Sequence, residues 1–246
     1  MIHRGMLAQQ IETVKLALKI RQHGTRSLSE AISQVKKSVD SVAVAELRRR
    51  LAPIYQKDPA SAAKYANLHH WLLFNALRVA DLELDTTASG LRILDIGCGP
   101  GYFVALTRAL GHQCYGVDAP DAYLSAVEQE VYATLTKALH CQDAVSPLLI
   151  ERFKPMPFRD QPFDCITAFW ICFNRHRQPD EWGVEEWRFF SEDALGCVRP
   201  GGRVVLDLNE NSERYGPLRF YDAATLDYFV SKGHVDQGRV LLFRPQ

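Results

Sequence analysis

The chain has 246 residues, of which 47% are hydrophobic and 24% charged, enough for one α/β domain with an appendage. The longest apolar runs are too short to span a bilayer, and Glu12 and Lys15 interrupt the stretch where a signal peptide needs an apolar run. Six cysteines form no CxxC pair, which suits reduced thiols and disfavours a structural zinc site. These features predict a cytoplasmic globular protein with neither a metal centre nor a membrane contact.

A net charge of zero hides an asymmetry. Residues 1–64 contain twelve Lys or Arg and five acidic residues, so this part carries +7 and the remainder −7. The basic segment has three candidate roles: a lid over a ligand, a dimer surface, or a contact with nucleic acid or membrane. Its charges form no stripe, and the run 48–50 has no interleaved aromatic residues. We favour the lid, leave a homodimer open, and regard nucleic acid as a less favoured partner.

Only helices are expected up to about residue 80, because apolar and charged residues mix there at helical spacing. Their signals are the run 9–21, the capping box Ser27-x-x-Glu30, the run 46–51 ending at Pro53, and the N-cap Asp58 with Pro59, which opens a helix to about Asp81. On the last of these helices Tyr65, His69, His70 and Trp71 are candidates for reaching an active site, although core packing is the preferred interpretation.

After Leu91, short β-rich runs alternate with helical stretches, which is typical of a parallel sheet with crossover helices. The expected strands are residues 92–96, 114–118, 148–153, 164–171, 203–208 and 239–243. The expected helices between them are residues 102–110, 122–139, 184–197 and a helix capped by Asp222 that ends at Gly233. We therefore expect an N-terminal helical extension over residues 1–84 and an α/β domain over residues 85–246.

The strongest functional signal is the run from Arg92 to Phe103. A β-rich run stops at Asp95, three glycines allow a tight turn and close backbone approach, and an apolar helix follows at once. The next strand ends at Asp118, where a carboxylate can accept both ribose hydroxyls of a bound adenosine. This pattern predicts an adenosine-cofactor site made of Asp95, Gly97, Cys98, Gly99, Pro100, Gly101, Asp118 and Ala119, with Cys98 contributing backbone.

Charge indicates which adenosine cofactor is bound. A pyrophosphate would lie against the helix N-terminus, whereas Asp95 places a carboxylate just before the loop, which repels phosphate and suits a cationic amino acid group. The glycines are spaced G-x-G-x-G, since Tyr102 stands where a dinucleotide fingerprint needs glycine. S-adenosylmethionine, which has an ammonium and a sulfonium but no phosphate, is the expected cofactor.

At these residues the chain resembles the class I S-adenosylmethionine-dependent methyltransferases. Residues 94–101 are similar to the family's first motif, residues 116–118 to its ribose-binding acid, residues 157–166 to the approach to its fourth strand, and residues 198–205 to the turn into its fifth. The resemblance covers roughly residues 90–210. It implies a Rossmann-like, doubly wound, mostly parallel sheet and methyl-transfer chemistry. The family's acid for the adenine amine has no clean counterpart, so Glu151 or Phe153 is expected in its place.

The substrate is expected beyond the C-terminal ends of the strands. Phe169 and Trp170 are candidates for covering adenine or the sulfonium, with core packing as the alternative. His176 is the candidate general base for a hydroxyl acceptor, with a surface position as the alternative. The leading hypothesis is a methyltransferase acting on a small molecule, with O-methylation slightly favoured. Its rivals are an RNA or protein methyltransferase that docks through the basic helices and a non-catalytic cofactor-binding protein.

Overall fold

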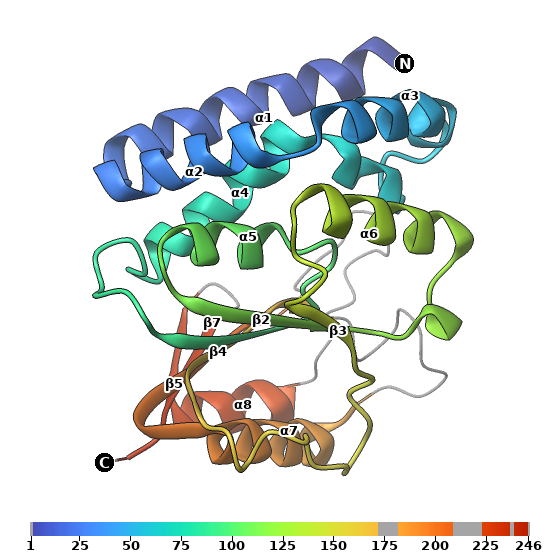
Figure 1. Ribbon diagram of the computed structural model, residues 1–246. Coiled ribbons are helices and arrows are strands. Elements are labelled where there is room, and N and C mark those ends of the chain that lie inside the picture. The colour runs from blue at the N-terminus through green and yellow to red at the C-terminus, as the bar shows by residue number, and fades with distance from the viewer. Residues whose placement is uncertain (1, 172–181, 209–222, 237–238, 246) are drawn as a thin grey trace. The chain divides into compact units, whose positions relative to one another are not determined.

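A computed structural model describes residues 2–171, 182–208, 223–236 and 239–245 of the chain (Figure 1). The fold has two compact units: the first comprises residues 1–90, 98–114 and 120–146, and the second comprises residues 91–97, 115–119 and 147–246. The chain passes between the units several times. The expected domain boundary at residue 84 stays a prediction.

The first unit is helical. Its elements are α1 (Ile2–His23), α2 (Arg26–Ser38), α3 (Ser41–Lys57), the 3-10 helix η1 (Ala62–Ala66), α4 (Leu68–Asp81), α5 (Tyr102–Ala109), the 3-10 helix η2 (Asp121–Tyr123) and α6 (Ala126–Ala138). Here α4 packs against both α1 and α5, and α6 packs against α3 and η1. The N-terminal helices therefore share one compact unit with the helix that follows the glycine loop.

Several helix boundaries differ from the sequence prediction; for example, α6 begins after the N-cap Ser125 and not at residue 122. The N-cap of α2 is Thr25, whose hydroxyl accepts the Leu28 N–H at 3.2 Å, so the Ser27 capping box was wrong; Glu30 pairs instead with Arg26 at 2.8 Å. Pro53 lies inside α3 and does not end it. Asp58 begins a turn, because its carboxylate accepts the Ala60 N–H, and the long helix expected from there is divided into η1 and α4.

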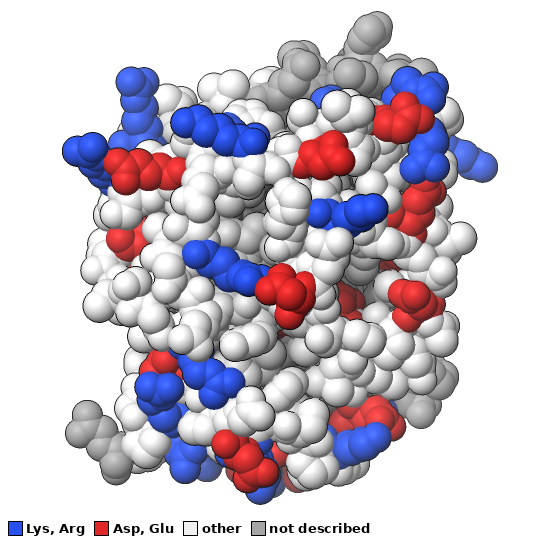
Figure 2. All heavy atoms as spheres, in the orientation of Figure 1, with Lys and Arg blue, Asp and Glu red and all other residues white. Residues whose placement is uncertain are grey.

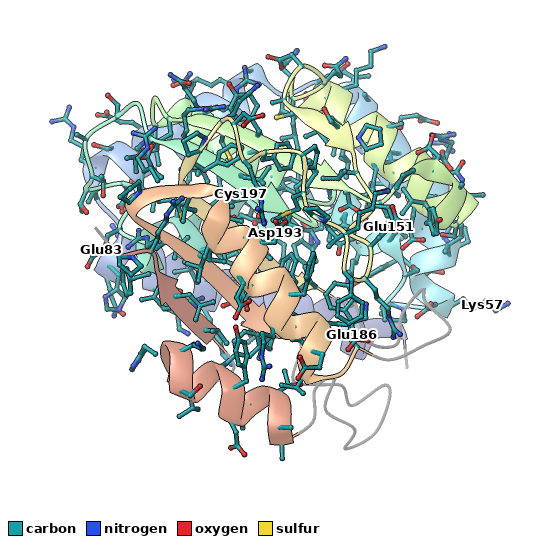
Figure 3. All side chains as sticks on the ribbon, turned by 90° about the horizontal axis from the view of Figure 1, so that it is seen from below. Lys57, Glu83, Glu151, Glu186, Asp193 and Cys197 are labelled. Carbon is teal, nitrogen blue, oxygen red and sulfur yellow. The ribbon has the colours of Figure 1, made fainter. Side chains whose placement is uncertain are left out.

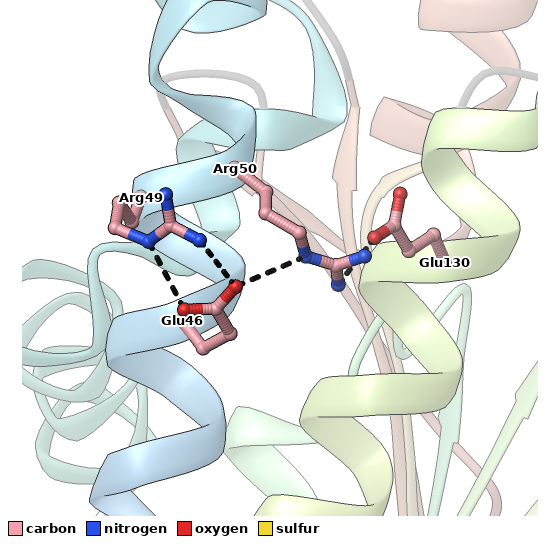
Figure 4. Close-up of polar contacts among 4 residues, drawn as sticks. All are labelled: Glu46, Arg49, Arg50 and Glu130. Atoms are coloured by element: carbon pink, nitrogen blue, oxygen red, sulfur yellow. Dashed lines mark hydrogen bonds and ion pairs between the residues drawn. The ribbon is translucent and has the colours of Figure 1, made fainter.

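An ion-pair network joins α3 to α6. The Arg50 guanidinium lies 2.5 Å from a Glu130 carboxylate oxygen on α6 and 3.9 Å from Glu46 on its own helix, and Arg49 pairs with Glu46 at 2.7 Å (Figure 4). The backbone adds a second link, since the Asp40 N–H donates to the Ala138 carbonyl at 3.1 Å. These contacts neutralise part of the basic N-terminal segment within its own unit.

A seven-stranded sheet runs in the order β3-β2-β1-β4-β5-β7-β6. Its strands are β1 (Arg92–Ile96), β2 (Gln113–Asp118), β3 (Val145–Pro147), β4 (Phe163–Ile171), β5 (Val198–Leu208), β6 (His234–Asp236) and β7 (Arg239–Phe243). The pairs β1–β4 and β4–β5 are parallel, and β7 is antiparallel to both β5 and β6. From β1 the chain builds outwards first through β2 and β3 and then through β4 and β5. The topological switch point therefore lies between β1 and β4, where open α/β sheets bind ligands.

The described strands bear out five of the six expected positions. The third was wrong: β3 ends at Pro147, and residues 148–153 form an irregular segment. Its first residue is held to the neighbouring strand by backbone, because the Leu148 N–H donates to the Asp118 carbonyl at 2.8 Å. The apolar residues at the start of 148–153 favour a strand by composition, but the segment forms no strand pairing.

The helices α7 (Val184–Gly196) and α8 (Ala223–Lys232) lie together against the strands of the second unit (Figure 1). Trp187, Phe190 and Phe229 are the large aromatic side chains of this core, at 2%, 3% and 0% exposure. Burying each such ring contributes roughly 1.5–3 kcal/mol, which makes this packing a main source of the unit's stability. The predicted fold class, a Rossmann-like sheet that is mostly parallel, is confirmed. Within the described ranges, no helix combines the length and apolar character that crossing a bilayer requires.

Candidate functional site

The end of β1 places a buried carboxylate at the switch point. Asp95 is 3% exposed, and the Thr167 hydroxyl on the paired strand β4 donates to its Oδ1 at 2.8 Å. A buried carboxylate requires such hydrogen bonds, because an isolated ionised group is costly to remove from water. Asp95 is therefore held in a fixed orientation immediately before the glycine loop.

Gly97 turns the chain out of the sheet. Its φ of +71° lies in the left-handed region, and its N–H donates to the Val117 carbonyl at 2.8 Å. A Cβ at this position would lie 3.3 Å from Cγ2 of Ile171, the last residue of β4. The ends of β1 and β4 thus meet at Gly97, where a larger residue would be both strained and crowded.

The rest of the loop leads directly into α5. Gly99 and Gly101 have φ values of +54° and +87°, and Gly101 is the N-cap of the helix. The turn closes through the Gly101 N–H, which donates to the Cys98 carbonyl at 3.1 Å, while the Pro100 carbonyl accepts the Thr136 hydroxyl at 3.4 Å. Backbone N–H groups that precede a helix in this way form a binding surface for a ligand's polar groups.

Asp118 is the last residue of β2 and is half-buried. Its Oδ1 accepts the N–H of the adjacent Ala119 at 2.7 Å, which fixes the carboxylate beside its own backbone. The end of the second strand is the position that the ribose-binding prediction requires.

The two aromatic candidates on β4 differ in exposure. Phe169 is 6% exposed, whereas Trp170 is 46% exposed with a φ of +53°. In the pairing with β5, Phe169 faces Asp207 and Ile171 faces Leu208, so Trp170 is the extra residue of a β-bulge. A bulky side chain in the left-handed region is costly, and such residues concentrate at functional edges of sheets. Trp170 is the aromatic side chain that this edge presents to solvent.

The segment after β3 is held along one side of α7 (Figure 3). Asp193, 3% exposed, accepts the Met156 N–H at 2.7 Å and the Arg159 guanidinium at 2.7 and 3.0 Å. Arg152 lies 3.6 Å from Glu186, and the Phe153 ring centroid is 5.8 Å from that of Phe189. Residues 186, 189 and 193 share one helix face, since they are spaced three and four apart.

The contacts with α7 fix the segment that carries Glu151 and Phe153, the two candidates for binding the adenine amine. Phe153 is 54% exposed and has a φ of +54°, so its neighbours hold it in a conformation that phenylalanine rarely adopts. Glu151 pairs with Lys154 at 2.5 Å. Sequence reasoning missed Asp193, because a single aspartate within a helix carries no signal of the loop that it will anchor.

Of the candidates expected on the last N-terminal helix, Tyr65 lies on η1 and is bonded to the residue that follows the glycine loop. The Tyr102 hydroxyl donates to the Tyr65 carbonyl at 2.6 Å, and burial raises the pKa of Tyr102 well above its usual range. His70 hydrogen-bonds Thr13 on α1 at 3.0 Å, and burial lowers its pKa. Burial also lowers the pKa of His69, with Lys36 adding to the effect. The candidate base His176 lies outside the described residues.

These features define a class of protein: an α/β domain of Rossmann type with a glycine-rich turn between strand and helix at its switch point. Residues 94–206 match the family model described as methyltransferase domain. This match includes the glycine loop and the end of β2, and it confirms the resemblance to class I S-adenosylmethionine-dependent methyltransferases drawn from the sequence.

Individual relatives match only part of the chain. A tRNA U34 carboxymethyltransferase from Methylococcus capsulatus is 35% identical over 119 residues, 48% of this chain and 32% of that protein. A 2-methyl-6-phytyl-1,4-hydroquinone methyltransferase from Synechocystis is 28% identical over 140 residues, 56% of this chain and 39% of that protein. The alignment with the crystal structure of the methyltransferase SibL covers 99% of this chain and 76% of the SibL chain, at 18% identity and a TM-score of 0.47. The chain thus spans well under two thirds of the two curated relatives' lengths.

Proposed function

We propose that this protein binds S-adenosylmethionine at the glycine loop and transfers the methyl group to a small-molecule acceptor that carries a hydroxyl group. The observation that carries the proposal is the arrangement at the end of β1: the buried carboxylate of Asp95, the left-handed turn at Gly97, and α5 beginning directly after Gly101. The cofactor supplies a methyl group activated by a sulfonium, which leaves the protein mainly the task of alignment.

The side chains proposed to contact the cofactor suit its chemistry. The fixed carboxylate of Asp95 favours the cationic amino acid portion, and Asp118 at the end of β2 is placed to accept the ribose hydroxyls. The exposed aromatic rings Phe153 and Trp170 are proposed to contact adenine and the sulfonium. Backbone groups of Cys98, Pro100 and Ala119 complete the proposed contacts, and Phe169 is buried in strand β4.

The acceptor is proposed to be small because the basic N-terminal segment is not an unbroken cationic surface. Arg26, Arg49 and Arg50 each pair with a carboxylate in the first unit. On the face shown in Figure 2, basic and acidic side chains are interspersed. RNA-binding surfaces usually cluster Lys and Arg on one face.

RNA is the second candidate acceptor. The +7 charge of residues 1–64 favours it, and one curated relative is named for tRNA and another for 18S rRNA. Binding to RNA through phosphate contacts weakens steeply as salt increases. The two candidates therefore differ in a measurable way.

The test follows transfer of a radiolabelled methyl group to a panel of small hydroxyl compounds and, in parallel, to bulk tRNA at 50 and 200 mM salt. Label in a small compound supports the proposal. Label in tRNA, with binding that falls steeply with salt, supports the RNA alternative. Tight S-adenosylhomocysteine binding without transfer to any acceptor would indicate a non-catalytic binding protein and overturn the proposal.

The proposed base is tested in the same assay. If His176 removes the acceptor proton, His176→Gln lowers turnover by a factor of about 10²–10⁴ and leaves S-adenosylhomocysteine affinity unchanged. The wild-type rate should rise with pH through a pKa near about 6–7, and the variant should lose that limb. An unchanged rate and pH profile would leave alignment as the whole mechanism.

A further inference from the structure

Gly99, the middle glycine of the loop, faces a tyrosine. A Cβ built on Gly99 would have, among the described residues, only the Tyr132 Oη at 3.9 Å and Cζ at 4.0 Å within 4 Å. Tyr132 stands on α6, in the same compact unit as this part of the loop. A ligand that approaches Gly99 on this side therefore meets a phenol hydroxyl.

A second tyrosine sets the orientation of the first. The rings of Tyr65 and Tyr132 meet edge to face, with centroids 6.0 Å apart and planes at 66°. The Tyr65 ring also packs on that of Trp71, with centroids 4.6 Å apart, and the Lys64 ammonium lies 5.1 Å from the Tyr65 centroid and 5.6 Å from the Trp71 centroid. Such contacts favour particular orientations of the rings.

A hydrogen bond ties this stack to the loop. Tyr102, the residue after Gly101, donates its hydroxyl to the Tyr65 carbonyl at 2.6 Å. Tyr102 is 2% exposed, so its ring cannot move without disturbing the packing around it. The segment η1, far from the loop in sequence, is thus attached to the first turn of α5.

We propose that the Tyr132 hydroxyl binds the carboxylate of the cofactor's amino acid portion beside Gly99, and that Tyr65 is a positioning residue that holds the Tyr132 ring for this contact. The inference rests on the proposed function, in which Asp95 and the glycine loop receive the amino acid portion. A phenol O–H donating to a carboxylate is a charge-assisted hydrogen bond, which is stronger than a neutral one.

Comparing two ligands distinguishes a loss of the carboxylate contact from a general loss of cofactor binding. S-adenosylhomocysteine carries the amino acid portion, whereas 5′-methylthioadenosine keeps the adenosine and lacks the carboxylate. Calorimetric titration of Tyr132→Phe should show about tenfold weaker binding of S-adenosylhomocysteine, the usual effect of losing one charge-assisted hydrogen bond. Binding of 5′-methylthioadenosine should change less than about twofold.

The positioning role has its own variants. Tyr65→Leu removes the ring that orients Tyr132 and should weaken S-adenosylhomocysteine in the same selective way, while Tyr65→Phe keeps the ring and should restore affinity. Tyr123→Phe, an exposed tyrosine on η2 of the same unit, is the control and should match wild type. Thermal unfolding of each variant verifies that the fold is kept.

The outcomes distinguish the inference from the function on which it rests. Wild-type protein that binds neither ligand would overturn the proposed function. Wild-type binding together with an unaffected Tyr132→Phe variant, or an equal loss of both ligands, would overturn the role of Tyr132 and leave the proposed function standing.

Discussion

Thr167 donates its hydroxyl to the carboxylate of Asp95 across the parallel pair β4–β1, with 2.8 Å between the two oxygens. Both side chains are buried, at 0% and 3% exposure. The stability of the central strands and the orientation of a proposed cofactor contact therefore depend on the same hydrogen bond.

Replacing this hydroxyl should destabilise the protein. Thr167→Val keeps the shape but leaves the buried Asp95 carboxylate with one donor fewer, at a cost of about 1–3 kcal/mol. Urea unfolding measures the loss. The control is Thr107→Val, because Thr107 is equally buried but its hydroxyl donates to carbonyls of its own helix α5. Equal unfolding free energies for the two variants would show that the hydrogen bond to Asp95 stabilises the protein no more than the hydrogen bonds of Thr107 within α5.

Asp118→Ala should weaken S-adenosylhomocysteine binding by roughly 1–3 kcal/mol, because charged hydrogen bonds to the ribose are lost. Isothermal titration calorimetry gives the value directly. Asp121→Ala, at an exposed carboxylate three residues further on, is the matched control and should bind as wild type does. Unchanged affinity in Asp118→Ala would remove this residue from the site.

Gly99→Val should abolish cofactor binding while the protein stays folded. Valine is strained at a φ of +54°, and its methyl groups would fill the space between the loop and Tyr132. Gly90→Val is the control: Gly90 has a φ of +96° and nothing within 4 Å of an added Cβ, so it carries similar backbone strain outside the loop. Retained affinity in Gly99→Val would mean that the loop is only a turn.

Asp193→Ala should lower the free energy of unfolding by about 2–4 kcal/mol. The substitution leaves the Met156 N–H and the Arg159 guanidinium without the buried carboxylate that accepts both of them. Glu185→Ala removes an exposed partner of Arg188 on the same helix and should cost less than about 0.5 kcal/mol. Chemical unfolding compares the two. A small effect at Asp193 would show that the segment holding Phe153 does not need this anchor.

The buried thiols should react only at high pH. Burial is the first cause that raises the pKa of Cys141, Cys165 and Cys197 to about 11 each. At pH 8 about one in a thousand is then a thiolate, so iodoacetamide should leave them unmodified in the folded protein. The unfolded thiols release their protons earlier, so unfolding free energy should fall as pH rises from about 9 towards 11. Mass spectrometry identifying fast modification at pH 8 would contradict this.

The sequence predicted the glycine loop well because its signals are local. A β-rich run, closely spaced glycines and an apolar helix lie within a dozen residues, and the structure places β1, the left-handed turns and α5 as expected. The end of the next strand at Asp118 was predicted in the same way, and the ribose-binding role of this residue stays a prediction.

Other features depend on contacts that no local pattern contains. The irregular segment after β3 is held by Glu186 and Asp193 on a helix about forty residues away in the chain. Pro53 inside α3 is tolerated because α3 packs on η1 and α6, which outweighs the intrinsic cost of proline in a helix. The contact of Tyr132 with Gly99 likewise appears only once α6 is packed in its unit.

The β-bulge at Trp170 gives the protein an optical probe of its own. Of its four tryptophans, Trp71, Trp182 and Trp187 are at most 8% exposed, whereas the bulge leaves the indole of Trp170 46% exposed. A collisional quencher such as acrylamide therefore reaches the emission of one residue well before that of the others. Trp170 directly precedes Ile171, whose Cγ2 would lie 3.3 Å from a Cβ added at Gly97, so a ligand bound at this edge is expected to change the fluorescence of Trp170 without any attached label.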